Sequence, residues 1–158
     1  MKTIDEWLTL YGRDHQNPVN KLIHWICVPV ILFTVFGLLM AIPFPEIANG
    51  WVNPASIIFL AALIFYLRLS FPIFAGMVLV GFFFLWANRY LSTTILPSIG
   101  LSLWQFSLIV FVIAWIFQFI GHKIEGQKPS FFEDLQFLLI GPAWLLHFVL
   151  KKLGIPYK

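Results

Sequence analysis

Long stretches of the chain carry no charged residue, and short polar segments separate them. Aspartate, glutamate, lysine and arginine are absent from residues 22–45, 47–67, 69–88 and 90–122. An α-helix needs about 20 largely apolar residues to span the hydrocarbon core of a bilayer, and each of these stretches is long enough. A fifth charge-free stretch, 135–150, has only 16 residues. The pattern predicts an all-α protein whose helices cross a membrane.

Cap and turn residues indicate where these helices begin and end. Asn17-Pro18 and Asn53-Pro54 each join a residue that caps a helix to a proline that suits its first turn. The predicted spans are residues 19–42, 53–68, 72–90 and 101–121, and a further helix is predicted over residues 131–152. Residues 3–14 predict a short helix with one apolar face. This helix is expected to lie against the membrane surface, because its tryptophan and tyrosine suit that interface.

The composition supports a single membrane-embedded bundle over residues 1–158. Hydrophobic residues make up 60% of the chain and charged residues 11%, whereas soluble domains carry about 25% charged residues. The formal net charge of +3 comes without any basic run, so no nucleic-acid partner is predicted. Cys27 is the only cysteine, which excludes an intrachain disulfide bond.

The distribution of lysine and arginine predicts the orientation. These residues are retained in the short loops on the cytoplasmic side. With four crossings, nine of the ten lie on one side and only Arg89 lies on the other. If the fifth helix also crossed, the split would be six to four, so this helix is expected to enter only part-way or to lie on the surface. Both chain ends are then cytoplasmic, at a bacterial inner membrane or at the endoplasmic reticulum of a eukaryote.

The four histidines are the candidates for chemistry. His15 and His24 flank the start of the first span, and His122 ends the fourth. An even number of crossings brings these three to the same face of the membrane, and His147 can join them if the fifth helix returns there. Imidazole is the commonest metal ligand in proteins, and ionisable groups within a membrane mark functional sites. The sequence therefore predicts a histidine metal site at the cytoplasmic interface.

Helical spacing adds candidate neighbours to these ligands. Asn20 lies one turn before His24 and is expected to orient its imidazole. Gln118, His122 and Glu125 follow at intervals of four and three residues, which puts them on one helix face. Gln118 is a further candidate for contact with a ligand. Glu125 is open to three interpretations: a metal ligand, a partner of a ligand, or a surface charge.

Two segments built around these histidines resemble a known family. They are HQNPVNKLIHWICVP, from His15 to Pro29, and QFIGHKIEGQKP, from Gln118 to Pro129, and a helix containing Gly-Pro follows. The family comprises small multi-span membrane proteins, among them the 2-hydroxy fatty acid dioxygenase of the yeast endoplasmic reticulum. The resemblance implies that O2 and Fe(2+) are used to cleave a 2-hydroxy fatty acid to an acid one carbon shorter. It also implies that His15, His24 and His122 bind the iron, whereas a role for His147 rests only on the topology.

The resulting hypothesis is an Fe(II)-dependent dioxygenase that takes its fatty-acid substrate from the membrane. Its substrate carboxylate is expected near the histidines, where Lys123 can attract it. Two alternatives remain open at this point. One is a non-catalytic membrane protein that binds lipid or assists assembly, and the other is a carrier of b-type haem with two histidines as axial ligands.

Overall fold

The structure is a computed structural model that describes residues 2–126, 128 and 136–157. All of its regular elements are helical, and in chain order they are α1 (Ile4–Arg13), α2 (Pro18–Met40), η1 (Ala48–Gly50), α3 (Pro54–Leu69), α4 (Phe71–Tyr90), η2 (Leu91–Ile95), η3 (Leu96–Ile99), α5 (Leu103–Glu125) and α6 (Phe137–Lys152). No β-strand occurs among the described residues, where Ile47 and Val52 form an isolated bridge. The predicted all-α class is confirmed.

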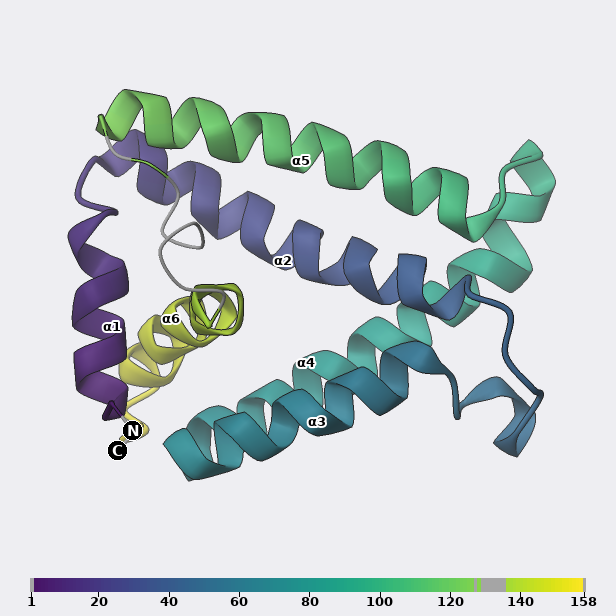
Figure 1. Cartoon of the computed structure of the whole chain (residues 1–158), viewed down its shortest axis with the longest axis horizontal. Coiled ribbons are helices and arrows are strands. Elements are labelled where there is room, and N and C mark those ends of the chain that lie inside the picture. The colour runs from purple at the N-terminus through teal and green to yellow at the C-terminus, as the bar shows by residue number, and fades with distance from the viewer. Residues whose placement is uncertain (1, 127, 129–135, 158) are drawn as a thin grey trace.

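Two pairs of helices form the body of the molecule (Figure 1). α2 packs along α5, and α3 packs along α4 as an antiparallel hairpin. The pairs meet at one end of the molecule and diverge toward the other. At the diverging end α6 contacts α1, α2 and α4, and α1 stands across that end. This arrangement leaves room between the two pairs for the site described below.

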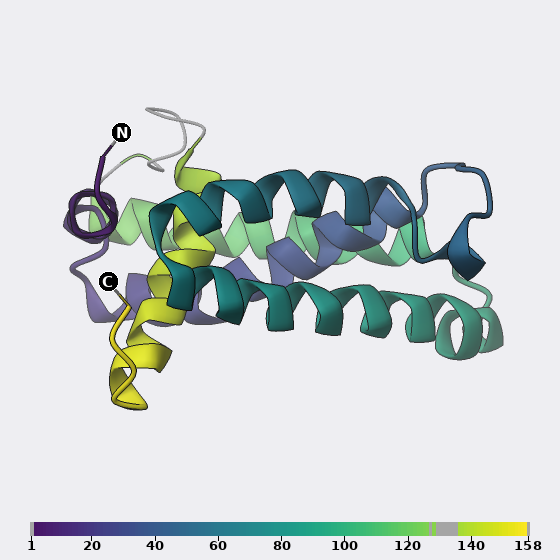
Figure 2. The ribbon, with the colours of Figure 1, turned by 90° about the horizontal axis from the view of Figure 1, so that it is seen from below.

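The described chain contains three helical segments that are long and apolar enough to cross a membrane: Pro18–Met40, Phe71–Ile99 and Leu103–Glu125. The remaining predicted span forms α3, which has 16 residues. At a rise of about 1.5 Å per residue it is about 24 Å long, short of the roughly 30 Å hydrocarbon core. Both chain ends and the turn between α3 and α4 lie at the same end of the molecule, as four alternating helices require (Figures 1 and 2).

The predicted helix starts are confirmed by their caps. The Asn17 side chain accepts a hydrogen bond from the backbone N–H of Val19 at 2.8 Å, and Asn53 caps α3 in the same way through Ser56. Thr3 and Glu6 form a capping box at the start of α1. The segment between the predicted spans 72–90 and 101–121 is helical through η2 and η3 and ends at Gly100, whose φ is +69°.

Helices α1 and α6 pack against each other. The predicted apolar face of α1 is buried in the protein, with Trp7 3% exposed and its ring 5.4 Å from that of Phe137. The face expected to contact the membrane is therefore covered largely by α6. The predicted start of this last helix, residues 131–135, lies outside the described residues. α6 runs across the long helices and not alongside them, which fits a helix that does not cross the membrane (Figure 2).

Candidate metal centre and its cavity

Three histidines from three different segments meet in the interior. His15 lies in the turn between α1 and α2, His24 in the second turn of α2, and His122 in the last turn of α5. One ligand atom from each lies within 4.8 Å of the others. The ring centroids are 4.2 to 5.2 Å apart, and the three residues are only 1%, 1% and 4% exposed. These residues are called the histidine group below.

Backbone carbonyls fix two of the rings. Nδ1 of His15 donates to the carbonyl oxygen of Tyr11 at 2.6 Å, and Nδ1 of His24 donates to that of Asn20 at 2.9 Å. Since a carbonyl only accepts, both rings carry their proton on Nδ1 and present the lone pair of Nε2. Within the described part of the chain, the buried Nε2 of His15 and Nδ1 of His122 have no hydrogen-bond partner. Buried polar atoms without a partner are rare and suggest a missing ligand.

The histidine group fits a transition-metal ion. Two nitrogens that bind one metal ion at about 2.1 Å each can be no more than about 4.2 Å apart. The ligand atoms of the histidine group lie within 4.8 Å of one another, so a shift of less than about 1 Å would bring them to binding distance. Burial lowers the pKa of His15 to about 4, so its imidazole is neutral near pH 7, as a ligand must be. Three imidazoles suit iron, zinc, copper or nickel, and they leave coordination positions open for other ligands.

Glu125 supports the group from outside. It is not among the residues whose ligand atoms converge. Its carboxylate accepts hydrogen bonds from the backbone N–H of Gln16 at 2.8 Å and of Asn17 at 2.9 Å, and from the Asn20 side chain at 3.0 Å. The end of α5 is thereby joined to the turn that carries His15. Of its three predicted interpretations, the geometry favours a partner that positions ligands.

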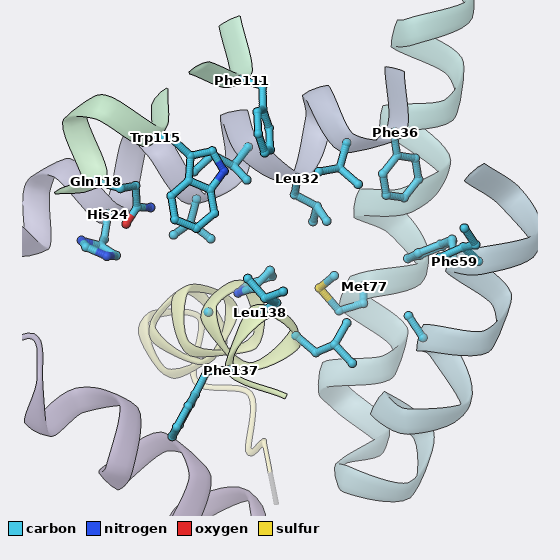
Figure 3. Close-up of a pocket in the computed structure, with 18 of the residues that line it drawn as sticks. His24, Leu32, Phe36, Phe59, Met77, Phe111, Trp115, Gln118, Phe137 and Leu138 are labelled. Carbon is cyan, nitrogen blue, oxygen red and sulfur yellow. The ribbon is translucent and has the colours of Figure 1, made fainter. Parts of the chain in front are cut away.

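Asn20 lies at the centre of these contacts and is fully buried. It meets His24 as the spacing predicts, but its backbone carbonyl makes the contact, and its side chain turns toward Glu125. Gly121 of α5 permits this approach, because a Cβ atom there would lie 2.4 Å from Oδ1 of Asn20. Gln118, the other predicted neighbour, lies beside His24 (Figure 3).

Two predicted site residues lie elsewhere. The ring of His147 packs 4.0 Å from that of Phe148 and 5.4 Å from that of Tyr157, and its Nδ1 donates to the carbonyl of Trp144. His147 is not part of the converging group. Lys123 is exposed on α5 and does not line the cavity beside the histidines.

An apolar cavity of about 320 Å³ begins at the histidine group. His24 and Gln118 lie at one end of it, and Phe36 and Phe59 lie at the other (Figure 3). One face of α2 forms a wall along its length, and α3, α4, α5 and α6 contribute the remaining sides. A volume above about 300 Å³ with few polar groups is typical of a binding site for a small apolar molecule.

Tyr11 was missed by the sequence analysis. Its carbonyl orients His15, its ring stacks on that of His15 at 4.3 Å and 9°, and it lines the cavity. The signal was available, because Tyr11 lies four residues before His15, as Asn20 lies before His24. The cavity itself had no signal in the sequence, since it depends on how the two helix pairs diverge.

Fold and site together define a helical membrane protein with a buried group of three histidines that could bind a metal ion, at one end of an apolar cavity. Comparison with known sequences gives the family. The chain belongs to the family described as 2-hydroxy-palmitic acid dioxygenase Mpo1-like, whose family model matches residues 1–153.

One curated relative is the 2-hydroxy-palmitic acid dioxygenase MPO1 of Saccharomyces cerevisiae. It is 30% identical over 151 residues, which cover 93% of this chain and 79% of the yeast protein. No solved structure matches the chain significantly. The resemblance read from the two histidine segments is thus confirmed, as is the assignment to a class of enzymes, the dioxygenases.

Proposed function

We propose that this protein is an Fe(II)-dependent dioxygenase that converts membrane-resident 2-hydroxy fatty acids to acids one carbon shorter. The observation that carries the proposal is the position of the histidine group, which ends a long apolar cavity. A fatty acid has the same two parts, a polar head that can bind a metal and an apolar tail. The yeast relative is named for such a substrate, a 2-hydroxy acid with a long chain.

The residues of the chain have distinct roles in this proposal. His15, His24 and His122 hold the metal, and the carbonyls of Tyr11 and Asn20 keep two of the rings aimed at it. When bound, Fe(2+) would supply the site that takes up the substrate's carboxylate and hydroxyl and activates O2. The apolar walls bind the tail and exclude water, so that the head is held at the histidine group during the reaction.

The overall reaction balances without another reductant. One 2-hydroxy acid and one O2 give the shortened acid, carbon dioxide and water. The bond between C1 and C2 breaks, C2 becomes the new carboxyl carbon, and four electrons pass from the two carbons to O2. The partners required are therefore the lipid substrate and O2 alone.

We further propose that the end of the molecule with the histidine group faces the cytoplasm. The nine-to-one distribution of lysine and arginine supports this orientation, and the described chain ends lie at that same end. Reporter fusions at the two termini test it, and activity of an exclusively extracytoplasmic reporter at either end would contradict it.

The test combines metal content with turnover. Detergent-purified protein is loaded anaerobically with Fe(II), and iron per chain is measured by mass spectrometry for wild type, His122→Ala and His147→Ala. We expect about one iron per chain in wild type and in His147→Ala, and little in His122→Ala, because only His122 belongs to the histidine group. His147→Ala is the matched control, since it also removes a buried imidazole, but one that lies outside the histidine group.

Turnover is then followed by mass spectrometry of 2-hydroxy fatty acids under O2. Formation of the acid one carbon shorter by wild type but not by His122→Ala supports the proposal. No iron in loaded wild type, or iron without any shortened acid, would contradict it. A Soret band in the protein as purified would instead support the haem alternative.

A further inference from the structure

Two aromatic rings lie at the end of the cavity remote from the histidine group, where Leu39 and Ala55 also line it. Phe36 comes from α2 and Phe59 from α3, and they are 3% and 9% exposed. Their ring centroids are 5.2 Å apart and the planes are tilted by 58°. Figure 3 shows both rings at the far side of the cavity from His24. They form the surface that the end of an acyl chain would meet.

The ring of Phe59 lies directly on the backbone of α4. A Cβ atom added to Gly81 would lie 2.0 and 2.1 Å from Cζ and Cε1 of that ring. Carbon atoms in contact are about 3.5–4.0 Å apart, so no residue other than glycine admits the ring in this position. Gly81 lies within a span-length helix, where glycine is permitted because neighbouring helices pack closely. The contact between Phe59 and Gly81 therefore determines how close to α4, and how far from the cavity, the Phe59 ring lies.

The length of the cavity corresponds to a long acyl chain. His24 and Phe36 are twelve residues apart on the same helix, which is about 18 Å at 1.5 Å per residue. Carbon–carbon bonds of about 1.5 Å in staggered conformation advance about 1.3 Å each along an extended chain. An extended acyl chain of about fourteen carbons therefore spans the distance from His24 to Phe36, in addition to the carbons held at the histidine group.

We propose that Phe59, seated against Gly81, is the specificity-determining end wall that limits the length of the acyl chain. The inference rests on the proposed function only in that the cavity takes the tail of a fatty acid. Phe59 separates the cavity from the α4 backbone, so removing its ring lengthens the cavity. Displacing the ring from α4 pushes the ring into the cavity and shortens the cavity.

Two substitutions shift the preferred length in opposite directions. Phe59→Ala removes the ring, and we expect the optimum to rise by about two carbons or more. Gly81→Ala places a methyl group where the ring tip lies, so the ring must move about 1.5 Å to restore contact. We expect its optimum to fall by about one carbon. In the double variant Gly81→Ala/Phe59→Ala no ring remains to be displaced, and the optimum should rise as in Phe59→Ala.

Binding measures this property without turnover. Saturated, non-hydroxylated fatty acids of even and odd length from ten to twenty carbons displace a fluorescent fatty acid from the purified full-length protein in detergent. Phe82→Ala is the matched control. Phe82 follows Gly81 in the sequence, but its ring is 62% exposed and faces away from the interior. Thermal unfolding of each variant checks that the fold is retained, and the double variant keeps the test valid if Gly81→Ala alone unfolds.

The two opposite shifts, with Phe82→Ala like wild type, support the end wall. If folded Phe59→Ala bound fatty acids with the same dependence on length as wild type, the end-wall proposal would be overturned. That result would indicate that the acyl chain leaves the cavity between the helices. Absence of binding by wild type at every length would also overturn the proposal. Failure of the proposed function gives a different result: the length profiles shift as expected, but no 2-hydroxy acid is shortened.

Discussion

Glu125 offers the sharpest test of how the site is held together. Replacing it with alanine removes one carboxylate that accepts hydrogen bonds from two backbone donors in the turn between α1 and α2 and from the Asn20 side chain at the start of α2. That turn carries His15 and leads directly into the helix that carries His24. Glu125→Ala is therefore expected to weaken iron binding although the residue is not a ligand.

The contacts set the size of the effect. Hydrogen bonds to a charged group contribute about 1.5–3 kcal/mol each when buried. Here the backbone donors of Gln16 and Asn17 are near solvent and can be hydrated, whereas the Asn20 side chain cannot. The Asn17 side chain also continues to cap α2. A net loss of about 1–3 kcal/mol follows, and residues that orient metal ligands typically change metal affinity by about 10- to 100-fold.

Competition with a chromophoric Fe(II) chelator under anaerobic conditions measures this affinity. Glu46→Gln and Glu46→Ala are the controls, because Glu46 is an exposed carboxylate in the loop at the opposite end of the molecule. Wild-type affinity in folded Glu125→Ala would refute the positioning argument. Complete loss of iron, equal to that of His122→Ala, would also refute it and make Glu125 a ligand.

Three further substitutions test other parts of the structure. His147→Ala should lower thermal stability, because its buried ring packs on Phe148, while turnover of a 2-hydroxy acid stays within about twofold of wild type; a large loss of turnover in the folded variant would contradict the geometry. Gly121→Ala should weaken iron binding by about tenfold or more, because its methyl group displaces Asn20, whose carbonyl orients a ligand. Chelator competition measures this change, and unchanged affinity would contradict it. Tyr66→Phe should lower the free energy of unfolding by about 1–2 kcal/mol, because the hydroxyl of Tyr66 donates to the carbonyl of Leu139 at 2.8 Å and joins α3 to α6. A thermal melt in detergent that matches wild type would count against this contact.

The helices were predictable because each has a signal along the sequence itself. Charge-free stretches mark the spans, and Asn-Pro pairs mark where α2 and α3 begin. The short length of α3 was also visible, since its predicted span had only sixteen residues. The position of α6 was not predictable. Charge counting predicts that this helix does not cross the membrane, which stays a prediction, and nothing in the sequence indicates that it covers the apolar face of α1.

The site was predictable only as far as topology determines it. An even number of crossings brings the start of α2 and the end of α5 to one face, which was sufficient to bring His15, His24 and His122 together. His147 shows the limit of that argument. Sharing a face does not bring side chains within bonding distance, and the rotation of α6 turns this ring toward Phe148 and Tyr157. The position of Phe59 depends likewise on a contact with Gly81, which is distant in sequence.

The depth of the site within the spanning helix explains how a membrane lipid would reach it under the proposed function. His24 lies six residues after Pro18, about 9 Å into α2, and Phe36 lies about 18 Å further along. Half of a hydrocarbon core is about 15 Å thick, so the length of the cavity is comparable with the thickness of one leaflet. A fatty acid in that leaflet already has its carboxylate at the interface and its tail inward. Ile58 and Leu138 line the cavity yet are 52% and 48% exposed, which gives the tail a sideways path from the lipid. The substrate could thus enter without being inverted or withdrawn into water, which favours a lipid of the same leaflet over a soluble acid.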